Sequence, residues 1–324
     1  MSKAMPQQRH NAQKAPGRRL RREEKIAVCR ETISFFRELL DHNRYGPILA
    51  DSVPKTRMFH HPDALPPFQE KVDIAKEASG DASSADVNKL AVEDSTTTPS
   101  TPPTMKPLAT PTPRIFAGDT LDVAIRLKAT ENLNPLILNM ASIFKPGGGW
   151  QNGSSAQEEQ IFYRSTYDLP MTDHFKLDPG RKWRYPMPVT GGIYTPNVLV
   201  FRGNELNGYP IWEYEDCVFF NFVAVAALKN PVIVDGKFTD EGRDITGEKI
   251  RGILRIAGLT GHRDLLLGAL GCGAYGNPKR EVAMLFKEVF GEEEFQGWFD
   301  HLDFAILDTR QEGNCALFQE VLLG

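Results

Sequence analysis

The sequence predicts an α/β fold in three layers, in which helices cover both faces of a central sheet. From residue 114 onward, short apolar runs that suit buried strands alternate with stretches whose apolar residues follow helical spacing. In addition, two glycine-rich loops, residues 146–149 and 271–278, each follow a predicted strand and precede a predicted helix. Ligands of such folds bind beyond the carboxyl ends of the strands, so both loops are candidate parts of one site.

Composition limits the classes of function. The chain has 324 residues, 41% of them hydrophobic, and a formal net charge of −4. This length allows one large domain or two small ones, and the charge predicts neither nucleic-acid nor membrane binding. No apolar run approaches the ~20 residues of a membrane helix, and the N-terminus lacks the apolar region of a signal peptide. We therefore expect an intracellular protein, nuclear or cytoplasmic, that does not bind DNA directly.

The four cysteines are widely separated and include no CxxC pair. They are Cys29, Cys217, Cys272 and Cys315. This spacing favours reduced thiols over disulfides or a zinc cluster, and we expect no metal or other cofactor.

The first third of the chain divides into three segments. Residues 1–22 read as a disordered basic tail, in which the four arginines between Arg18 and Arg22 suit nuclear import, a polyanion contact or plain solvation. Residues 23–73 read as an accessory helical segment, with a helix over Glu23–Leu40. Residues 74–113 are rich in proline, threonine and serine and read as a disordered linker or inserted loop.

Residues 114–324 form the predicted main domain. A strand at Arg114–Ala117 precedes a helix that Asp119 or Thr120 would cap. Further strands are expected at Leu136–Met140, Ile193–Tyr194, Val198–Phe201, Val218–Val225, Leu265–Leu270 and Phe304–Leu307. Helices are expected to start near Gln157 and to include Ile250–Ala257, Val282–Val289 and Cys315–Leu322, with residues 226–246 as an irregular connection.

The two glycine-rich loops are candidate phosphate sites. The first contains Gly147, Gly148 and Gly149, whose N–H groups suit a phosphate or ribose, although a tight turn without a ligand explains them too. The second offers the backbone of residues 273–277 and the positive end of a helix that begins near Pro278. Within it, Tyr275 suits packing against a sugar or base, or over the domain core.

Gln157-Glu158-Glu159 is the candidate for acid/base chemistry. The pairs Ser155/Glu158 and Ser154/Gln157 have the spacing of a capping box. Either pair would leave Glu159 without a structural explanation, because consecutive helical residues point ~100° apart. Adjacent carboxylates raise each other's proton affinity when they are partly desolvated, which suits a proton donor. A solvated helix start remains the alternative.

These motifs resemble the poly(ADP-ribose) glycohydrolases (PARGs). Their signature is GGG followed, after six to eight residues, by QEE, and here seven residues separate the two. The segments NMAS before PGGG, YRS after QEE and LGALGCGAYGNP further on resemble the microbial-type branch. So does the Tyr194-Thr195-Pro196…Val200-Phe201-Arg202 block. The resemblance covers about residues 114–308 and implies a macrodomain-like fold with a mixed central sheet, preceded by an accessory helix.

The resemblance also implies roles for individual residues. Glu159 would be the catalytic acid/base, and Glu158 would hydrogen-bond the ribose hydroxyls beside the scissile bond. Among the substrate-binding residues, Asp119 would contact the adenine amine. Gly147, Gly148 and Gly149 would lie at the diphosphate and terminal ribose. The second loop would line the other side of the diphosphate with Gly273, Ala274, Tyr275, Gly276 and Asn277. Lys145 replaces an asparagine that is common before PGGG, so Ser142 or Gln157 would take over ribose recognition.

The implied reaction is hydrolysis of the ribose–ribose O-glycosidic bonds of poly(ADP-ribose), mainly from the free end, which releases ADP-ribose. The substrates would be poly(ADP-ribose) or ADP-ribosylated proteins, the enzyme a monomer, and its context the reversal of ADP-ribosylation in the DNA damage response. Three alternatives stay open. They are a non-catalytic ADP-ribose-binding module, a hydrolase of mono-ADP-ribosyl protein or O-acetyl-ADP-ribose, and an unrelated nucleotide-binding scaffold. The last is disfavoured because neither loop contains GK[ST] or GxGxxG.

Overall fold

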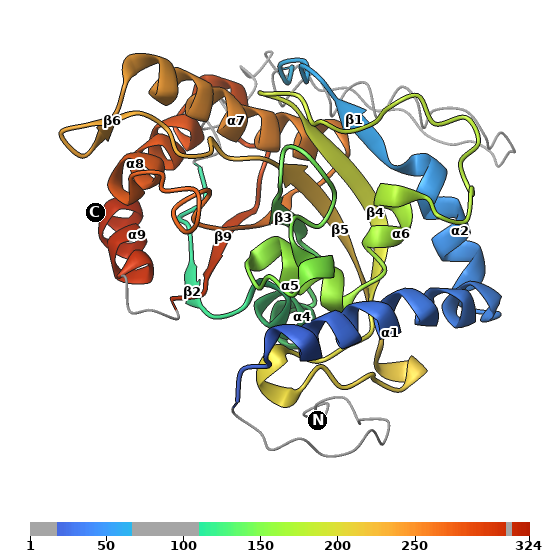
Figure 1. The fold of residues 1–324 in the computed structure, drawn as a ribbon. Helices are drawn as coiled ribbons and strands as arrows, with labels where there is room; N and C mark the ends of the chain where they lie inside the picture. Colours follow the sequence, from blue (N-terminus) through green and yellow to red (C-terminus); the bar gives the residue numbers. More distant parts are fainter. Residues whose placement is uncertain (1–17, 67–109, 309–312) are drawn as a thin grey trace, which may run out of the picture.

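A computed structural model describes residues 18–66, 110–308 and 313–324. It confirms the predicted α/β class, because helices cover a mixed seven-stranded sheet on both faces (Figure 1). The predictions for residues 1–17 and for most of the segment 74–113 lie outside the described residues. Within them, no helix is long and apolar enough to cross a membrane.

The strand order of the main sheet is β1-β4-β5-β3-β8-β9-β2. The strands are β1 (Arg57–Phe59), β2 (Ile115–Ala117), β3 (Leu136–Met140), β4 (Gly192–Val200), β5 (Val218–Val225), β8 (Asp264–Leu267) and β9 (His301–Ile306). The β1–β4 and β4–β5 pairs are antiparallel, and the remaining pairs are parallel. A separate hairpin consists of β6 (Ile233–Val234) and β7 (Lys237–Phe238).

Two apolar layers hold the helices against this sheet. On one face lie α7 (Asp240–Leu259), α8 (Lys279–Phe290) and α9 (Asn314–Leu323), and on the other lie α4 (Thr120–Glu131) and α5 (Gln157–Arg164), with α1 (Arg22–Asp41) packed outside them (Figure 1). A third cluster joins α1 to α2 (Gly46–Lys55) and α6 (Asp168–Thr172). Fully buried aromatic rings such as Phe162, Phe222 and Phe286 fill these layers.

Several predicted elements are confirmed with their boundaries, and three predictions need correction. The two strands expected around Pro196 are a single strand, β4, which continues through a bulge where Asn197 has a φ of 51°. Helix α7 begins at Asp240, because the Thr239 hydroxyl caps it by accepting from Gly242 N at 3.2 Å. Strand β8 ends at Leu267 rather than Leu270.

The N-terminal segment contributes to the sheet as well as to the helical layer. Strand β1 pairs with β4, with Arg57 opposite Tyr194, and so extends one edge of the main sheet. Residues 23–59 are therefore built into the fold that carries the site.

The sheet order places the two glycine-rich loops side by side. Strands β3 and β8 are parallel neighbours, with Leu136 opposite Leu265 and Ile137 opposite Leu266. Their carboxyl ends therefore meet at the same edge, and the loops that follow both strands lie next to each other. This is the edge at which sheets of this kind bind their ligands.

Candidate active site

The glycine triplet folds tightly back onto helix α5. Gly147 and Gly148 have φ values of 69° and 52°, a region that glycine adopts with little strain. A Cβ atom on Gly147 would lie 2.5 Å from Cδ1 of the buried Trp150. Glycine is thus required at this position by both conformation and space.

Glu158, in the first turn of α5, is a buried residue whose carboxyl group lies against the backbone that follows β3. Its side chain accepts hydrogen bonds from the backbone N–H of Ser142 at 2.8 Å and of Gly147 at 3.1 Å. The residue is only 4% exposed, and Asn139 of β3 also hydrogen-bonds it. Burial, together with the neighbouring Glu159, raises the pKa of Glu158 to about 8 despite these donors. Glu158 therefore holds a proton at neutral pH.

Glu159 is bound at both carboxylate oxygens. Oε1 accepts from Gly149 N at 2.9 Å, and Oε2 accepts from Ala156 N at 2.7 Å. Ala156 is the N-cap of α5, so Glu159 supplies the helix-start hydrogen bond that the sequence assigned to Gln157 or Glu158. That expectation is wrong, because the helix begins two residues after Ser155 and Glu159 occupies the third helical position.

The two carboxylates converge on Gly148. A Cβ atom on this residue would lie 2.7 Å from Glu159 Oε1 and 3.0 Å from Glu158 Oε2. The missing side chain of Gly148 therefore leaves space that both acidic groups border. This arrangement brings together the glycine triplet and the QEE motif, as their sequence positions predicted.

Tyr275, in the second glycine-rich loop, lies near the same two carboxyl groups. Burial, with Glu158 and Glu159 nearby, raises the pKa of its phenol, and the Ser142 side chain hydrogen-bonds it. Gly273, Ala274 and Gly276 around it are exposed. Among the described residues, no acceptor pairs with the backbone N–H of Gly273, Ala274 or Tyr275. These donors are free to bind an anion next to the carboxylates.

Gln157 and Asn277 hold the two loops in place through their side chains. Gln157 Oε1 accepts from Met140 N at 2.9 Å, and its Nε2 donates to Leu138 O at 2.6 Å. Both amide atoms are thus engaged with β3, which leaves Ser142 as the better candidate for ribose recognition. Asn277 is 3% exposed, and its Nδ2 donates to Leu228 O at 2.7 Å. Lys145 is exposed on its loop.

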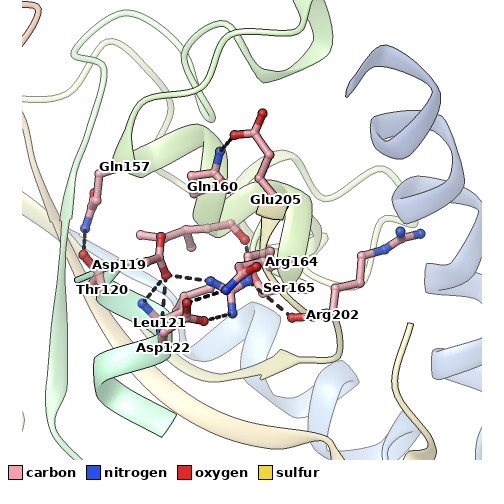
Figure 2. A network of polar contacts seen from close by, with 12 residues as sticks. Asp119, Thr120, Leu121, Asp122, Gln157, Gln160, Arg164, Ser165, Arg202 and Glu205 are labelled. Carbon is pink, nitrogen blue, oxygen red and sulfur yellow. Dashed lines mark hydrogen bonds and ion pairs between the residues drawn. The ribbon is translucent and has the colours of Figure 1, made fainter. Parts of the chain in front are cut away.

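Asp119 caps α4 and also pairs with a buried cation. Its Oδ1 accepts from Leu121 N at 2.9 Å and from Asp122 N at 3.2 Å, which confirms the predicted cap. The same oxygen contacts Arg164 Nη1 at 2.6 Å, and Arg164 Nη2 contacts Asp122 Oδ1 at 2.6 Å (Figure 2). Arg164 is 1% exposed and ends the helix that carries Glu158 and Glu159.

Two polar groups near the site escaped the sequence analysis. Arg164 ties the helix of the carboxylates to Asp119, and its place in an otherwise apolar segment, IFYR, is the signal that marks it as buried and paired. Asn139 hydrogen-bonds Glu158 from inside β3. An asparagine within a buried apolar strand is the corresponding signal, since buried amides need partners.

Burial of Glu158 has a consequence for stability. Because its pKa is raised to about 8 from a usual 4.5, the folded state holds this proton in a pH range where the unfolded state has released it. The free energy of unfolding therefore falls as pH rises through this range, by at most ~1.4 kcal/mol per pH unit. In Glu158→Gln we expect a flatter dependence of unfolding free energy on pH, measured by urea titration between pH 5 and 8.

The control for this measurement is Glu241→Gln. Glu241 lies exposed in the first turn of α7, and its substitution should leave the wild-type pH dependence unchanged. Parallel curves for wild type and Glu158→Gln would contradict the assigned protonation of Glu158.

No set of three or more histidine, cysteine, aspartate or glutamate side chains within the described ranges is arranged to hold a metal ion. The candidate site contains two carboxyl groups, one phenol and a set of backbone donors.

Comparison with known proteins gives the family. The family model for the microbial-type PARG catalytic domain matches residues 42–203, half of the chain, which includes both carboxylates. A comparison with curated proteins found no match.

Solved structures agree with this assignment. The PARG of Thermomonospora curvata is 25% identical, with a TM-score of 0.63 over 93% of this chain and 100% of its own. The PARG of Deinococcus radiodurans, solved in complex with ADP-ribose, is 25% identical, with a TM-score of 0.54 over 86% of this chain and 98% of its own. The resemblance read from GGG and QEE is thereby confirmed, and the chain belongs to the family of microbial-type poly(ADP-ribose) glycohydrolases.

Proposed function

We propose that this protein hydrolyses the ribose–ribose O-glycosidic bond of poly(ADP-ribose) at the carboxylate pair beside Gly148, and releases ADP-ribose. Glycohydrolase activity is the activity of the family, and the chain retains both acidic residues of its signature. The observation that carries the proposal is the convergence of Glu158 and Glu159 on the space left by Gly148. A module that only binds ADP-ribose needs no such pair.

Glu159 is the catalytic acid and base in this proposal. It protonates the departing 2′ oxygen of the next unit while the bond to the anomeric carbon breaks, and the terminal ribose passes through an oxocarbenium-like state. The ionised Glu159 then takes a proton from the water that attacks the same carbon. The proton returns to Glu159 and the products are ADP-ribose and a polymer one unit shorter.

The other site residues bind and orient the substrate. Glu158, held by the backbone of Ser142 and Gly147, accepts from or donates to the ribose hydroxyls next to the scissile bond. The unpaired N–H groups of residues 273–275 bind the diphosphate, and Tyr275 presses on the terminal ribose. Asp119 binds the adenine amine through Oδ2, because Oδ1 is engaged by the helix cap and Arg164.

One observation favours the reverse assignment of the pair as a second candidate. In the structure burial raises the pKa of Glu158, which suits a proton donor, while both oxygens of Glu159 are engaged as acceptors of backbone hydrogen bonds. If Glu158 is the donor, Glu158→Gln abolishes turnover. If Glu158 only orients the ribose, this variant raises KM and keeps part of kcat. Steady-state kinetics of the variant separate the two assignments.

We further propose that the enzyme acts as a monomer from the free end of the polymer on ADP-ribosylated proteins. Radiolabelled polymer attached to an acceptor protein tests the direction of attack. Single ADP-ribose units should appear from the first time point, while the average chain shortens gradually. Early release of oligomers would show internal cleavage instead, and removal of a single protein-linked unit would extend the substrate range.

For its location we propose the nucleus or cytoplasm, with the arginines of residues 18–22 as an import signal. Two of them already have partners in the fold, since Arg18 pairs with Glu24 and Arg22 donates to Asn152 O at 2.7 Å. A fluorescent fusion of the full chain in which Arg19 and Arg21 are replaced by alanine tests the signal. An unchanged distribution between nucleus and cytoplasm would exclude it.

A further inference from the structure

The N-terminal helix α1 lies over the loop that leads to the carboxylate pair. Arg22 Nε donates to Asn152 O at 2.7 Å, and a Cβ atom on Gly153 would lie 2.7 Å from the Arg22 backbone oxygen. Further along α1, Thr32 Oγ1 donates to Tyr163 O at 3.0 Å. These contacts join α1 to the loop before α5 and to the last turn of α5.

Glu205 joins this helix to the residues that flank Glu159. Its Oε1 accepts from Leu20 N at 3.0 Å and forms an ion pair with Lys25 Nζ at 3.0 Å. Its Oε2 accepts from Ser155 Oγ at 3.0 Å. The same oxygen accepts from Gln160 Nε2 at 3.3 Å (Figure 2). One carboxylate thus binds the N-terminal segment with one oxygen and the start of α5 with the other.

The residues held by Glu205 immediately surround the helix cap that Glu159 makes. Ser155 precedes Ala156, whose N–H binds Glu159, and Gln160 follows Glu159 in the chain. Gln160 Nε2 also donates to Ser155 Oγ at 2.7 Å, and its Oε1 accepts from Tyr209 at 2.8 Å. A shift of Glu205 would therefore move both neighbours of the Glu159 cap.

The ion pair that fixes Glu205 is buried. Lys25 is 8% and Glu205 is 7% exposed. Loss of one partner leaves the other charge in a poorly solvated position, so the pair resists separation. Its two members lie 180 positions apart in the chain, on α1 and on the short helix η2 (Glu205–Asn207).

We propose that Lys25 and Glu205 are positioning residues for catalysis, which hold Ser155 and Gln160 so that Glu159 keeps its place beside Gly148. The inference rests on the proposed function of Glu159. In this proposal α1 contributes to catalysis through Lys25, in addition to its packing against the fold. Displacements of about 1 Å at a catalytic group cost up to ~10²-fold in rate. Loss of the Lys25–Glu205 ion pair is therefore expected to lower kcat.

The test compares Lys25→Met with wild type in the full chain. Methionine keeps the length and helix propensity of lysine and removes its charge. We expect kcat for ADP-ribose release to fall by ~10-fold or more, with ADP-ribose binding retained and with activity restored in Lys25→Arg. Glu205→Gln provides a second variant that keeps the shape of the carboxylate, should Lys25→Met fold poorly.

Arg255→Met is the matched control. Arg255 forms a part-buried ion pair with Glu294 at 2.7 Å on the opposite face of the sheet. This variant is expected to lower thermal stability and leave kcat unchanged. A similar loss of stability in Lys25→Met, with wild-type kcat below the unfolding temperature, would overturn the proposal.

Hydrogen exchange separates failure of this inference from failure of the proposed function. Amides of residues 153–160 should exchange at least ~10-fold faster in Lys25→Met and at the wild-type rate in Arg255→Met. This measurement needs no substrate, so it shows whether Lys25 holds residues 153–160 in place even if the wild type releases no ADP-ribose. Unchanged exchange in this segment would show that Lys25 does not hold the catalytic loop.

Discussion

Glu159→Gln is expected to lower the rate of ADP-ribose release from poly(ADP-ribose) by ~10²–10⁴-fold, the range that a positioned general acid or base contributes. Glutamine cannot deliver the proton to the departing oxygen or accept one from water. It can still accept the hydrogen bond from Ala156 N through its amide oxygen, and glutamine is accepted at this position of a capping box. The variant should therefore fold and should still bind ADP-ribose.

The comparison needs a carboxylate with a similar helical position and no place in the site. Glu241→Gln in the first turn of α7 serves this purpose and should retain wild-type turnover. ADP-ribose binding by calorimetry and release from automodified acceptor are measured for both variants. Near-wild-type turnover by Glu159→Gln would exclude Glu159 as the catalytic acid.

Gly148→Ala is expected to lower turnover by ~10²-fold or more, because the new methyl group needs the space of the catalytic pair. Its Cβ would lie 2.7 Å from Glu159 Oε1 and 3.0 Å from Glu158 Oε2. One carboxylate must therefore move, or the methyl group occupies the position of the reacting ribose. The left-handed φ of 52° adds strain of ~1–2 kcal/mol.

Gly236→Ala separates this strain from the steric effect. Gly236 has a φ of 76° in the turn between β6 and β7, and a Cβ atom there would meet nothing within 4 Å. We expect this control to lose a comparable amount of stability and to keep full activity. Equal activity of the two variants would mean that the space beside Gly148 is not used by the substrate.

The sequence alone predicts much of this site, because its parts are local. Three glycines after a buried strand and QEE seven residues later set the distance between Gly148 and Glu159 within one short segment. The second loop could be placed at the same edge because Leu265–Leu270 reads as a buried strand, and parallel strands have their carboxyl ends at one edge. The family match confirms the glycohydrolase class that this pattern indicated.

The parts that the sequence could not predict depend on contacts between distant segments. The predicted start of α5 near Gln157 is confirmed, but the capping-box spacing assigned the cap to the wrong side chains, since Ser155 binds Glu205 and Gln160 instead of the helix backbone. The pairing of Lys25 with Glu205 joins distant parts of the chain, so no local sequence pattern predicts it. Likewise, the pKa of Glu158 depends on how deeply the folded chain buries it and on Glu159 beside it.

The most direct test of the proposed reaction is to identify the product of the wild-type enzyme by its mass. Purified protein is incubated with poly(ADP-ribose), and the released nucleotides are separated and weighed by mass spectrometry. Hydrolysis of the ribose–ribose bond predicts ADP-ribose as the accumulating product until the polymer is consumed. Release of AMP and phosphoribosyl-AMP, which requires cleavage of the diphosphate, or persistence of intact polymer would contradict the assignment of the carboxylate pair to the glycosidic bond.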